Sequence, residues 1–198
     1  MGAKRLVWRY REKEADDVAP GVVDGRRCAA FVIVDRHLEP QADEVVVVDV
    51  FVDSDWASGA ERKSTSGGMM CVDGVGIKHW SRTQKARALS SGEAEYYAMV
   101  TGGAEGLGMQ SLAEDLGWKV QVRVWTDSSA AKAVANRRGL GRLRHVELKW
   151  LWMQDMVKEG RIQLKTVRGN DNVADHLTKP KSREEVEALL RGVGAEFW

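Results

Sequence analysis

An almost unbroken run of valine and phenylalanine at residues 45–52 constrains the fold of this chain more than any other feature. Its β-branched and aromatic side chains favour an extended strand. A strand with one face in water alternates apolar and polar residues, whereas a run that is apolar at nearly every position is typical of a strand covered on both faces. The run ends at Asp53, Ser54 and Asp55, which indicate a polar turn. The sequence therefore predicts a buried strand over residues 44–52.

The remaining strands and helices are predicted from changes in the spacing of apolar residues along the chain. Strands are expected at residues 65–72 and 75–80, joined by Asp73-Gly74, a strong signal for a two-residue hairpin turn. Residues 91–116 have helical spacing, although four glycines each lower the stability of that helix by roughly 1 kcal/mol relative to alanine. Later elements are predicted as a strand at 121–126, helices at 128–136 and 146–158, a strand at 161–167, and helices at 171–177 and 182–190. The last helix begins with a capping box of Ser182 and Glu185.

Length and composition favour one domain with short extensions. The chain has 198 residues, of which 43% are hydrophobic, and a domain of roughly 150 residues fits that length. The N-terminal segment, residues 1–45, is predicted as a helix at 4–14, a loop at 16–27 and a strand at 28–34. Residues 46–182 form the predicted domain, and residues 183–198 a C-terminal helix and tail. The apolar residues of the tail are expected to pack on the domain; they are Leu189, Leu190, Val193, Phe197 and Trp198.

Charge and cysteine content exclude several classes of protein. The net charge is +1, from 30 basic and 29 acidic residues, so a nucleic-acid partner must be argued from local patches. Cys28 and Cys71 have no spacing typical of a zinc site or a disulfide framework. No apolar run is long enough to span a membrane, and the N-terminus lacks the apolar core of a signal peptide. We expect an intracellular protein without a membrane partner.

Four acidic residues lie at or near the ends of predicted strands and helices, where the fold can bring them close together. Asp53 and Asp127 each follow a strand, Glu95 is in the first turn of the long helix, and Asp175 is on the helix after the last strand. Such a group repels itself unless divalent cations neutralise it, which predicts a hard-metal site. Each acid alone has a simpler interpretation, as a turn former, a favourable charge at a helix start or a solvated helix residue. The turn role is favoured for Asp55.

A series of motifs resembles the ribonuclease H domain of copia-type LTR retrotransposon polyproteins. In order along the chain they are VDSDWA at residues 52–57, RKSTSGG at 62–68, ALSSGEAEY at 88–96, WTDSSA at 125–130, RHVELK at 144–149 and VADHLTKP at 173–180. The resemblance covers about residues 46–182. Residues 3–10, AKRLVWRY, look like the segment that connects the reverse transcriptase to this domain in those polyproteins.

The resemblance implies a fold and a metal site. The fold is α/β and ribonuclease H-like, with a five-stranded mixed sheet, the element order βββαβα(α)βα and helices on both faces. The four metal-binding and catalytic acids of the family correspond to Asp53, Glu95, Asp127 and Asp175. Two Mg²⁺ ions are implied, with Mn²⁺ as a substitute, and Glu93 is expected to serve the helix start and face solvent. The loop at residues 168–171 lacks the histidine of many ribonucleases H, and we expect His145 and His176 to be surface or capping residues.

The predicted contacts with nucleic acid lie in polar and basic loops. Ser90, Ser91 and Gly92 occupy the family's loop that reads the minor groove of the hybrid. A basic stretch suited to a phosphate backbone contains Lys78, Arg82 and Lys85, and Ser128 is a further candidate for substrate binding. A second basic stretch contains Arg137, Arg138, Arg142 and Arg144. Both stretches have the alternative interpretation of solvated loops.

The predicted function is hydrolysis of the RNA strand of RNA/DNA hybrids by a monomer that uses two metal ions. One alternative is a catalytically silent module that binds hybrids or has a structural role in a reverse transcriptase polyprotein. Another keeps the fold but changes the substrate, as in integrases, resolvases or exonucleases. A reverse transcriptase domain is a possible partner, and the chain is either free-standing or part of a longer protein.

Overall fold

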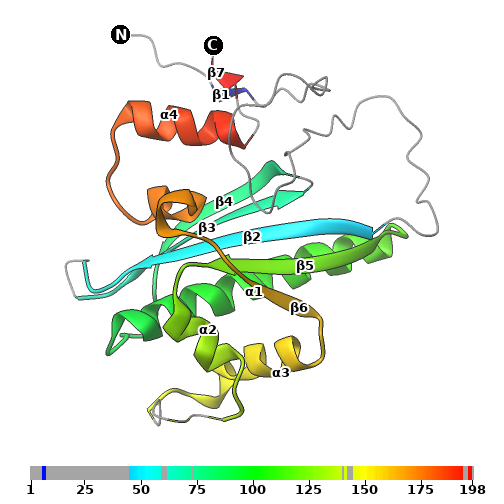
Figure 1. Cartoon of the computed structure of the whole chain (residues 1–198), viewed down its shortest axis with the longest axis vertical. Helices are drawn as coiled ribbons and strands as arrows, with labels where there is room; N and C mark the ends of the chain where they lie inside the picture. Colours follow the sequence, from blue (N-terminus) through cyan, green and yellow to red (C-terminus); the bar gives the residue numbers. More distant parts are fainter. Residues whose placement is uncertain are drawn as a thin grey trace.

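The computed structural model describes residues 6–7, 45–58, 62–72, 74–139, 141, 145–193 and 196–197. Within these residues a five-stranded sheet has the order β4-β3-β2-β5-β6 (Figure 1). The strands are β2 (Val45–Asp55), β3 (Thr65–Val72), β4 (Val75–Thr83), β5 (Lys119–Thr126) and β6 (Ile162–Thr166). β2 pairs antiparallel with β3 and parallel with β5, so the sheet is mixed, as predicted. The hairpin is also confirmed, because Val72 pairs with Val75.

β2 is the central strand, and its two faces contribute to different cores. Val48, Val50 and Val52 pack in the larger core cluster, while Phe51 packs in the smaller one on the other face. The alternation follows from the two-residue period of a strand. β2 runs three residues beyond its predicted end, because β3 pairs with it as far as Asp55. The predicted polar turn at Asp53–Asp55 is therefore wrong.

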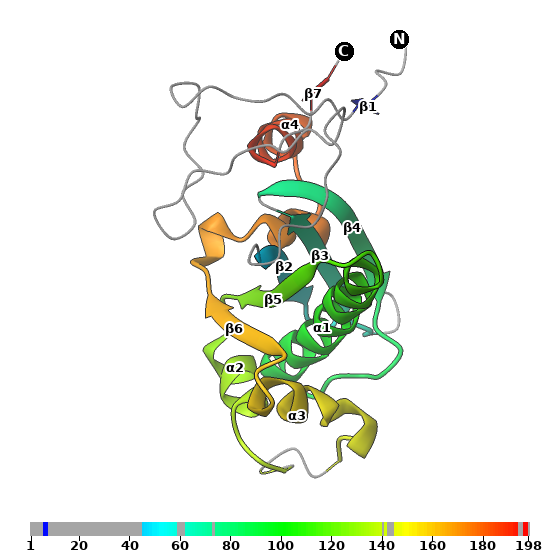
Figure 2. The ribbon, with the colours of Figure 1, turned by 90° about the vertical axis from the view of Figure 1, so that its right-hand side faces the viewer.

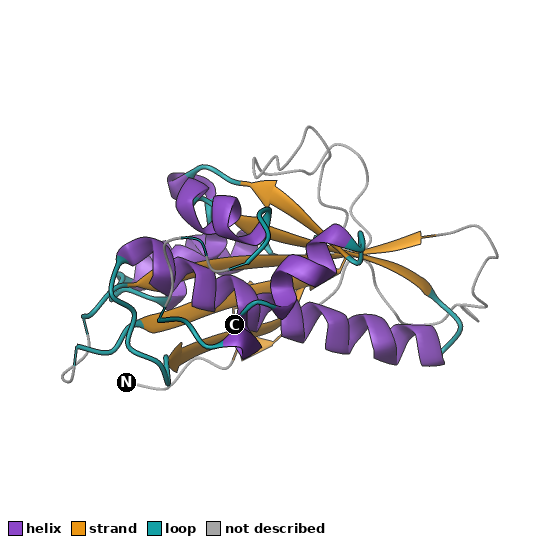
Figure 3. Cartoon of the chain, turned by 90° about the horizontal axis from the view of Figure 1, so that it is seen from below, coloured by secondary structure: helices purple, strands orange, loops and turns teal. Residues whose placement is uncertain are grey.

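Helices cover both faces of the sheet, as predicted (Figures 2 and 3). The larger core cluster joins the sheet to three helices: α1 (Ser91–Asp115), α2 (Ser129–Ala135) and α3 (Trp152–Lys158). On the other face, the smaller cluster joins the sheet to the 3₁₀ helix η3 (Val173–Leu177) and to Val193, which follows α4 (Arg183–Gly192). The capping box of α4 is confirmed, since Ser182 N donates to Glu185 Oε2 (2.8 Å) and Glu185 N donates to Ser182 Oγ (3.2 Å).

The glycines of α1 allow the helix to approach the sheet closely. A Cβ on Gly102 would lie 2.4 Å from Cγ1 of Val52, and one on Gly106 would lie 2.7 Å from Cγ1 of Val122. Real Cβ atoms do not approach other atoms so closely. The intrinsic cost of these glycines is thus offset by packing of the helix backbone directly on the valines of β2 and β5.

Two predicted α-helices are shorter or tighter than expected. The helix predicted at residues 146–158 consists of a 3₁₀ turn, η1 (Leu148–Trp150), and the short α3. The helix predicted at residues 171–177 consists of two 3₁₀ turns, η2 (Gly169–Asp171) and η3. Asn172 separates the latter two, because it is extended and its side chain accepts from the N–H of Ala174. An α-helical period in the sequence cannot distinguish such short 3₁₀ turns from α-helix.

The chain ends meet in a second, two-stranded sheet. β1 (Leu6–Val7) pairs antiparallel with β7 (Glu196–Phe197). The helix predicted at residues 4–14 is therefore wrong at Leu6 and Val7, and its other residues, like the strand predicted at 28–34, lie outside the described residues. Val193 is buried and its C=O accepts from the N–H of Gly76 (3.0 Å), so at this residue the C-terminal tail packs on the domain as predicted. Among the described residues, no helix combines the length and apolar character needed to cross a membrane.

Candidate metal centre

Three of the four predicted acids converge at one end of the sheet. Asp53 is on β2, Glu95 is in α1, and Asp127 directly follows β5. Each offers one carboxylate oxygen such that these atoms all lie within 4.8 Å of one another. The register explains the meeting of the two aspartates, because Phe51 pairs with Trp125 in the parallel β2–β5 ladder and each aspartate lies two residues further along.

Glu95 is half-buried, but one of its two oxygens is fully buried. Its Oε1 accepts from the N–H of Ser54 (3.3 Å), while its Oε2 is buried without a hydrogen-bond partner. Burial, reinforced by the negative charge of Asp53, raises the pKa of Glu95 to about 8. A buried oxygen without a donor is the condition that a bound cation would relieve.

Asp53 is held in place by a hydroxyl group. It is only 4% exposed, and its Oδ2 accepts from Thr178 Oγ1 (2.5 Å). Burial raises the pKa of Asp53 even though the hydrogen bond from Thr178 opposes the shift. Asp127, in contrast, is exposed, so the group has one open side. Three oxygen donors, one of them unpartnered, fit a hard divalent cation such as Mg²⁺.

Asp175, the fourth predicted acid, is next to this group but is not part of it. Its Oδ1 lies 2.5 Å from Nζ of Lys179, and its Oδ2 lies 2.9 Å from Nζ of Lys181. Burial is the largest single influence on this carboxyl and would raise its pKa, but hydrogen bonds from the two lysines outweigh it and lower the pKa of Asp175. Both of its oxygens therefore already have cationic partners.

Close packing on β3 places η3 beside Asp53. Gly67 pairs with Asp53 across the β2–β3 ladder, and a Cβ on Gly67 would lie 2.7 Å from Cγ2 of Thr178 and 3.0 Å from the C=O of Ala174. Asn172 is 1% exposed and its Nδ2 donates to the C=O of Val52 (2.9 Å). The glycine and the buried amide together fix the 3₁₀ segment against the sheet.

Four residues of this region were not identified as functional from the sequence: Asn172, Thr178, Lys179 and Lys181. Thr178 and Lys179 do occur in the VADHLTKP motif, and asparagine is a preferred residue at helix starts, so these are the signals that were available. Lys181 has no comparable signal, because its partner Asp175 lies six residues earlier, beyond the spacing of a regular helical pair.

Glu93 is buried, which contradicts its predicted role in solvent. It is 1% exposed; Tyr97 Oη donates to its Oε1 (2.6 Å) and the N–H of Leu89 donates to its Oε2 (3.1 Å). His145 Nε2 lies 2.9 Å from the same Oε2. The prediction failed because two of these partners lie outside the helix: Leu89 is in the preceding loop, and His145 is in a segment 52 residues later.

The predicted substrate-binding residues have different environments. Ser90 and Ser128 cap α1 and α2, because their hydroxyls accept from the N–H groups of Glu93 and Ala131. Lys78 and Arg82 form ion pairs with Glu105 on α1 (2.5 and 3.0 Å). The other candidates are the exposed Ser91 and Lys85 and the half-buried Gly92, which packs on Ala130.

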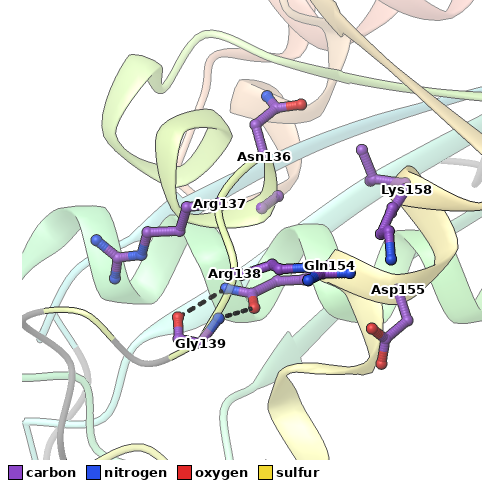
Figure 4. Close-up of a pocket in the computed structure, with 9 residues that line it drawn as sticks. Asn136, Arg137, Arg138, Gly139, Gln154, Asp155 and Lys158 are labelled. Atoms are coloured by element: carbon purple, nitrogen blue, oxygen red, sulfur yellow. Dashed lines mark hydrogen bonds between the residues drawn. The ribbon is translucent and has the colours of Figure 1, made fainter.

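The second basic stretch borders a pocket away from the acids. The pocket, of about 520 Å³, lies between α2 and α3, and none of the four predicted acids lines it. Arg137 and Arg138 line it, and the side chain of Gln154 holds Gly139 by accepting from its N–H (2.9 Å) and donating to its C=O (3.1 Å) (Figure 4). Asp155 and Lys158 lie on the other side of the pocket from Arg137. Arg142 and Arg144 lie outside the described residues.

The five-stranded mixed sheet with helices on both faces fits the predicted class, the ribonuclease H-like α/β domains. No protein-family model matches the chain. It is 31% identical over 147 residues to the retrovirus-related Pol polyprotein from transposon TNT 1-94 of Nicotiana tabacum. The aligned region covers 73% of this chain and 11% of that protein. It is 28% identical over 148 residues to the corresponding polyprotein from transposon RE2 of Arabidopsis thaliana, covering 73% of the chain and 10% of the polyprotein. The homologues of this chain are thus copia-type retrotransposon Pol polyproteins, as its motifs indicated.

The chain spans about a tenth of the length of these curated relatives. Among solved structures, it is similar to the N-terminal RNase H domain of rv2228c from Mycobacterium tuberculosis, with a TM-score of 0.46, 16% identity, and coverage of 74% of this chain and 97% of that one. It is also similar to LC11-RNase H1 in complex with an RNA/DNA hybrid, with a TM-score of 0.44, 17% identity, and coverage of 67% and 92%.

Proposed function

We propose that this chain is an endoribonuclease that hydrolyses the RNA strand of RNA/DNA hybrids with the help of two divalent metal ions. The observation that carries the proposal is the convergence of Asp53, Glu95 and Asp127 at an open end of the sheet. The homology to retrotransposon Pol polyproteins supports it, because copying an RNA genome into DNA passes through such a hybrid. We assign this activity to residues 46–182, with residues 1–45 as a connecting segment and 183–198 as a C-terminal extension.

The acids have complementary roles in this proposal. When bound, Mg²⁺ or Mn²⁺ would lower the pKa of a water and neutralise charge on the departing oxygen of the phosphodiester. The buried Asp53 and the half-buried Glu95 would hold a cation in a fixed position, and Thr178 orients Asp53 by its hydrogen bond. Asp127 is exposed and would face the scissile phosphate. Asp175 is assigned to the same centre as its fourth acid.

The hybrid is proposed to lie across the N-terminal end of α1. Ser90, Ser91 and Gly92 are at that end, where small polar groups can contact the 2′-hydroxyl of RNA in a minor groove. Ser128 and Lys85 are on neighbouring loops. Lys78 and Arg82 are proposed as more distant phosphate contacts, which must share their charge with Glu105. A reverse transcriptase domain is the proposed partner in a longer chain.

The test compares the parent with Asp127→Asn on three labelled substrates: an RNA/DNA hybrid, duplex DNA and duplex RNA. We expect Mg²⁺-dependent cutting of the RNA strand of the hybrid alone, and a loss of roughly 10³-fold or more in Asp127→Asn, because the exposed acid would contact reacting groups. Asp171→Asn is the matched control, since Asp171 is an exposed aspartate on the neighbouring turn. An Asp127→Asn variant that cuts at the parental rate would refute the proposed centre.

A second function, a silent hybrid-binding module, is favoured by one observation: both oxygens of Asp175 are paired with lysines. That function predicts parental affinity for the hybrid but no cutting with Mg²⁺ or Mn²⁺. The same three substrates, tested for binding by fluorescence anisotropy, distinguish the two functions.

A further inference from the structure

The segment after η3 supplies two positive charges to the acid group. Lys179 and Lys181 flank Pro180, so their side chains leave the backbone on either side of a residue that cannot continue a helix. Lys179 contacts Oδ1 of Asp175 and Lys181 contacts Oδ2. Each oxygen of Asp175 thus already gives one of its two lone-pair positions to an ammonium. A divalent cation on Asp175 would lie beside two positive charges, and their mutual repulsion favours displacement of at least one lysine.

The lysines also act on the acids beyond Asp175. The hydrogen bond with Asp175, reinforced by the negative charges of Asp53 and Asp55, raises the pKa of Lys179. Lys179 therefore neutralises part of the field that would otherwise attract metal. The two ammonium groups are still accessible, since the side chain of Lys179 is 47% exposed and that of Lys181 is 22% exposed.

We propose that Lys179 and Lys181 are internal counter-cations that compete with divalent metal for Asp175, and that a nucleic-acid phosphate releases Asp175 by attracting them. The inference rests on the proposed function, because it assumes that Asp53, Glu95 and Asp127 hold metal. Without nucleic acid, the metal affinity comes from those three acids alone. With nucleic acid, the exposed ammonium groups exchange a carboxylate for a phosphate, which is an equally suitable partner for lysine. Lys179 and Lys181 are thus positioning residues, which set when the fourth acid becomes available.

The experiment measures Mn²⁺ and Mg²⁺ binding to the full chain by isothermal titration calorimetry in the absence of nucleic acid. Lys179→Met with Lys181→Met removes both charges and keeps much of the side-chain volume. We expect this double variant to bind Mn²⁺ roughly tenfold more tightly than the parent, or to bind an additional equivalent. Adding Asp175→Asn to the double variant should abolish the gain. Lys149→Met is the control, because Lys149 pairs with Glu147 (2.7 Å) away from the three acids.

A second measurement uses Asp175→Asn alone, which leaves both lysines in place. We expect its Mn²⁺ affinity without nucleic acid to equal that of the parent within a factor of about two, since Asp175 is not yet available. A large loss in this variant, or parental affinity in the double lysine variant, would overturn the inference. Failure of the proposed function gives a different pattern, in which neither the parent nor any variant binds metal and Asp127→Asn changes nothing.

Discussion

At the scale of single residues, Glu95 shows most clearly how the centre departs from an ordinary protein surface. One of its oxygens accepts a backbone hydrogen bond and the other has no donor, although it is buried. Folding takes this carboxyl out of water and brings it close to Asp53, and both effects favour its protonated form. In the metal-free protein, therefore, ionisation of Glu95 lowers the stability of the folded state.

The stability of the metal-free protein should therefore depend on pH. The pKa of Glu95 rises from 4.5 to about 8 on folding, so between these values the unfolded chain releases a proton that the folded chain retains. Stability of the metal-free protein should therefore fall as pH rises through that range and level off above it. Glu95→Gln should remove much of this fall and raise the thermal midpoint by about 3 °C or more near pH 9.

Thermal unfolding followed by circular dichroism in a chelator, at several pH values, measures this effect. Glu114→Gln, at an exposed position near the end of α1, is the control for losing one negative charge. Parallel curves of midpoint against pH for the parent and Glu95→Gln would contradict the prediction.

Sequence patterns identified the acidic residues of the centre, but they did not predict the environments of those residues. Asp53, Glu95 and Asp127 could be grouped because strand ends and a helix start limit where such residues can lie. The burial of Glu93 could not be predicted, because Glu93 and Glu95 both occupy the first turns of α1 and one partner of Glu93, His145, comes from a segment 52 residues later. The pairing of Asp175 with Lys181 was missed because a separation of six residues is not the spacing of a regular helical pair.

At the scale of elements, α1 shows how a helix can pack its backbone directly against a sheet where glycines leave no side chain between them. Gly102 sits over Val50 and Val52, whereas Gly108 in the same helix has no neighbouring atom within 4 Å of where a Cβ would be. Alanine favours a helix over glycine by about 1 kcal/mol at either position. The two sites differ only in the space available, which makes them a matched pair.

Gly102→Ala is expected to destabilise the protein by roughly 1–3 kcal/mol, because the added methyl group must displace Val52 or tilt the helix. Gly108→Ala is expected to stabilise it by about 0.5–1 kcal/mol. Urea denaturation at equilibrium gives both free energies of unfolding. Equal effects of the two substitutions would show that helix propensity, and not contact with the sheet, decides them.

Element boundaries were predictable only where local signals decide them. The hairpin turn and the capping box of α4 depend on neighbouring residues, and both were predicted correctly. The end of β2 depends on β3, which pairs with Asp53, Ser54 and Asp55 and turns a polar, turn-like string into strand. Similarly, Asn172 tightens the segment before η3 through a bond to Val52, 120 residues away.

At the scale of the whole molecule, a few side-chain contacts connect segments far apart in the chain. His145 and Glu93 join the segment before η1 to the start of α1 across 52 residues. Trp56 Nε1 donates to the C=O of Ala88 (3.1 Å) and ties the end of β2 to the loop before α1. Both contacts border Ser90, so they restrict the loop that is proposed to contact the hybrid.

His145→Ala tests whether this histidine is structural or catalytic. Because the variant leaves buried Glu93 with one partner fewer, we expect a loss of about 1 kcal/mol in the free energy of unfolding. We expect the rate of hybrid cleavage at saturating substrate to stay within about threefold of the parent, since His145 contacts none of the four acids. His176→Ala provides the comparison. A fall in cleavage rate of about a hundredfold with unchanged stability would instead assign His145 to the chemistry.

The alternation along β2 has a consequence for how this protein can change over time. Val48, Val50 and Val52 pack with α1, and Phe51 and Asp53 follow the opposite phase. Deleting or inserting one codon within this strand would exchange the two sets, bringing carboxylates under the helix and valines to the metal-facing side. Single substitutions can therefore be tolerated within β2, but insertions and deletions cannot. Variation in length should therefore be confined to the connections between strands.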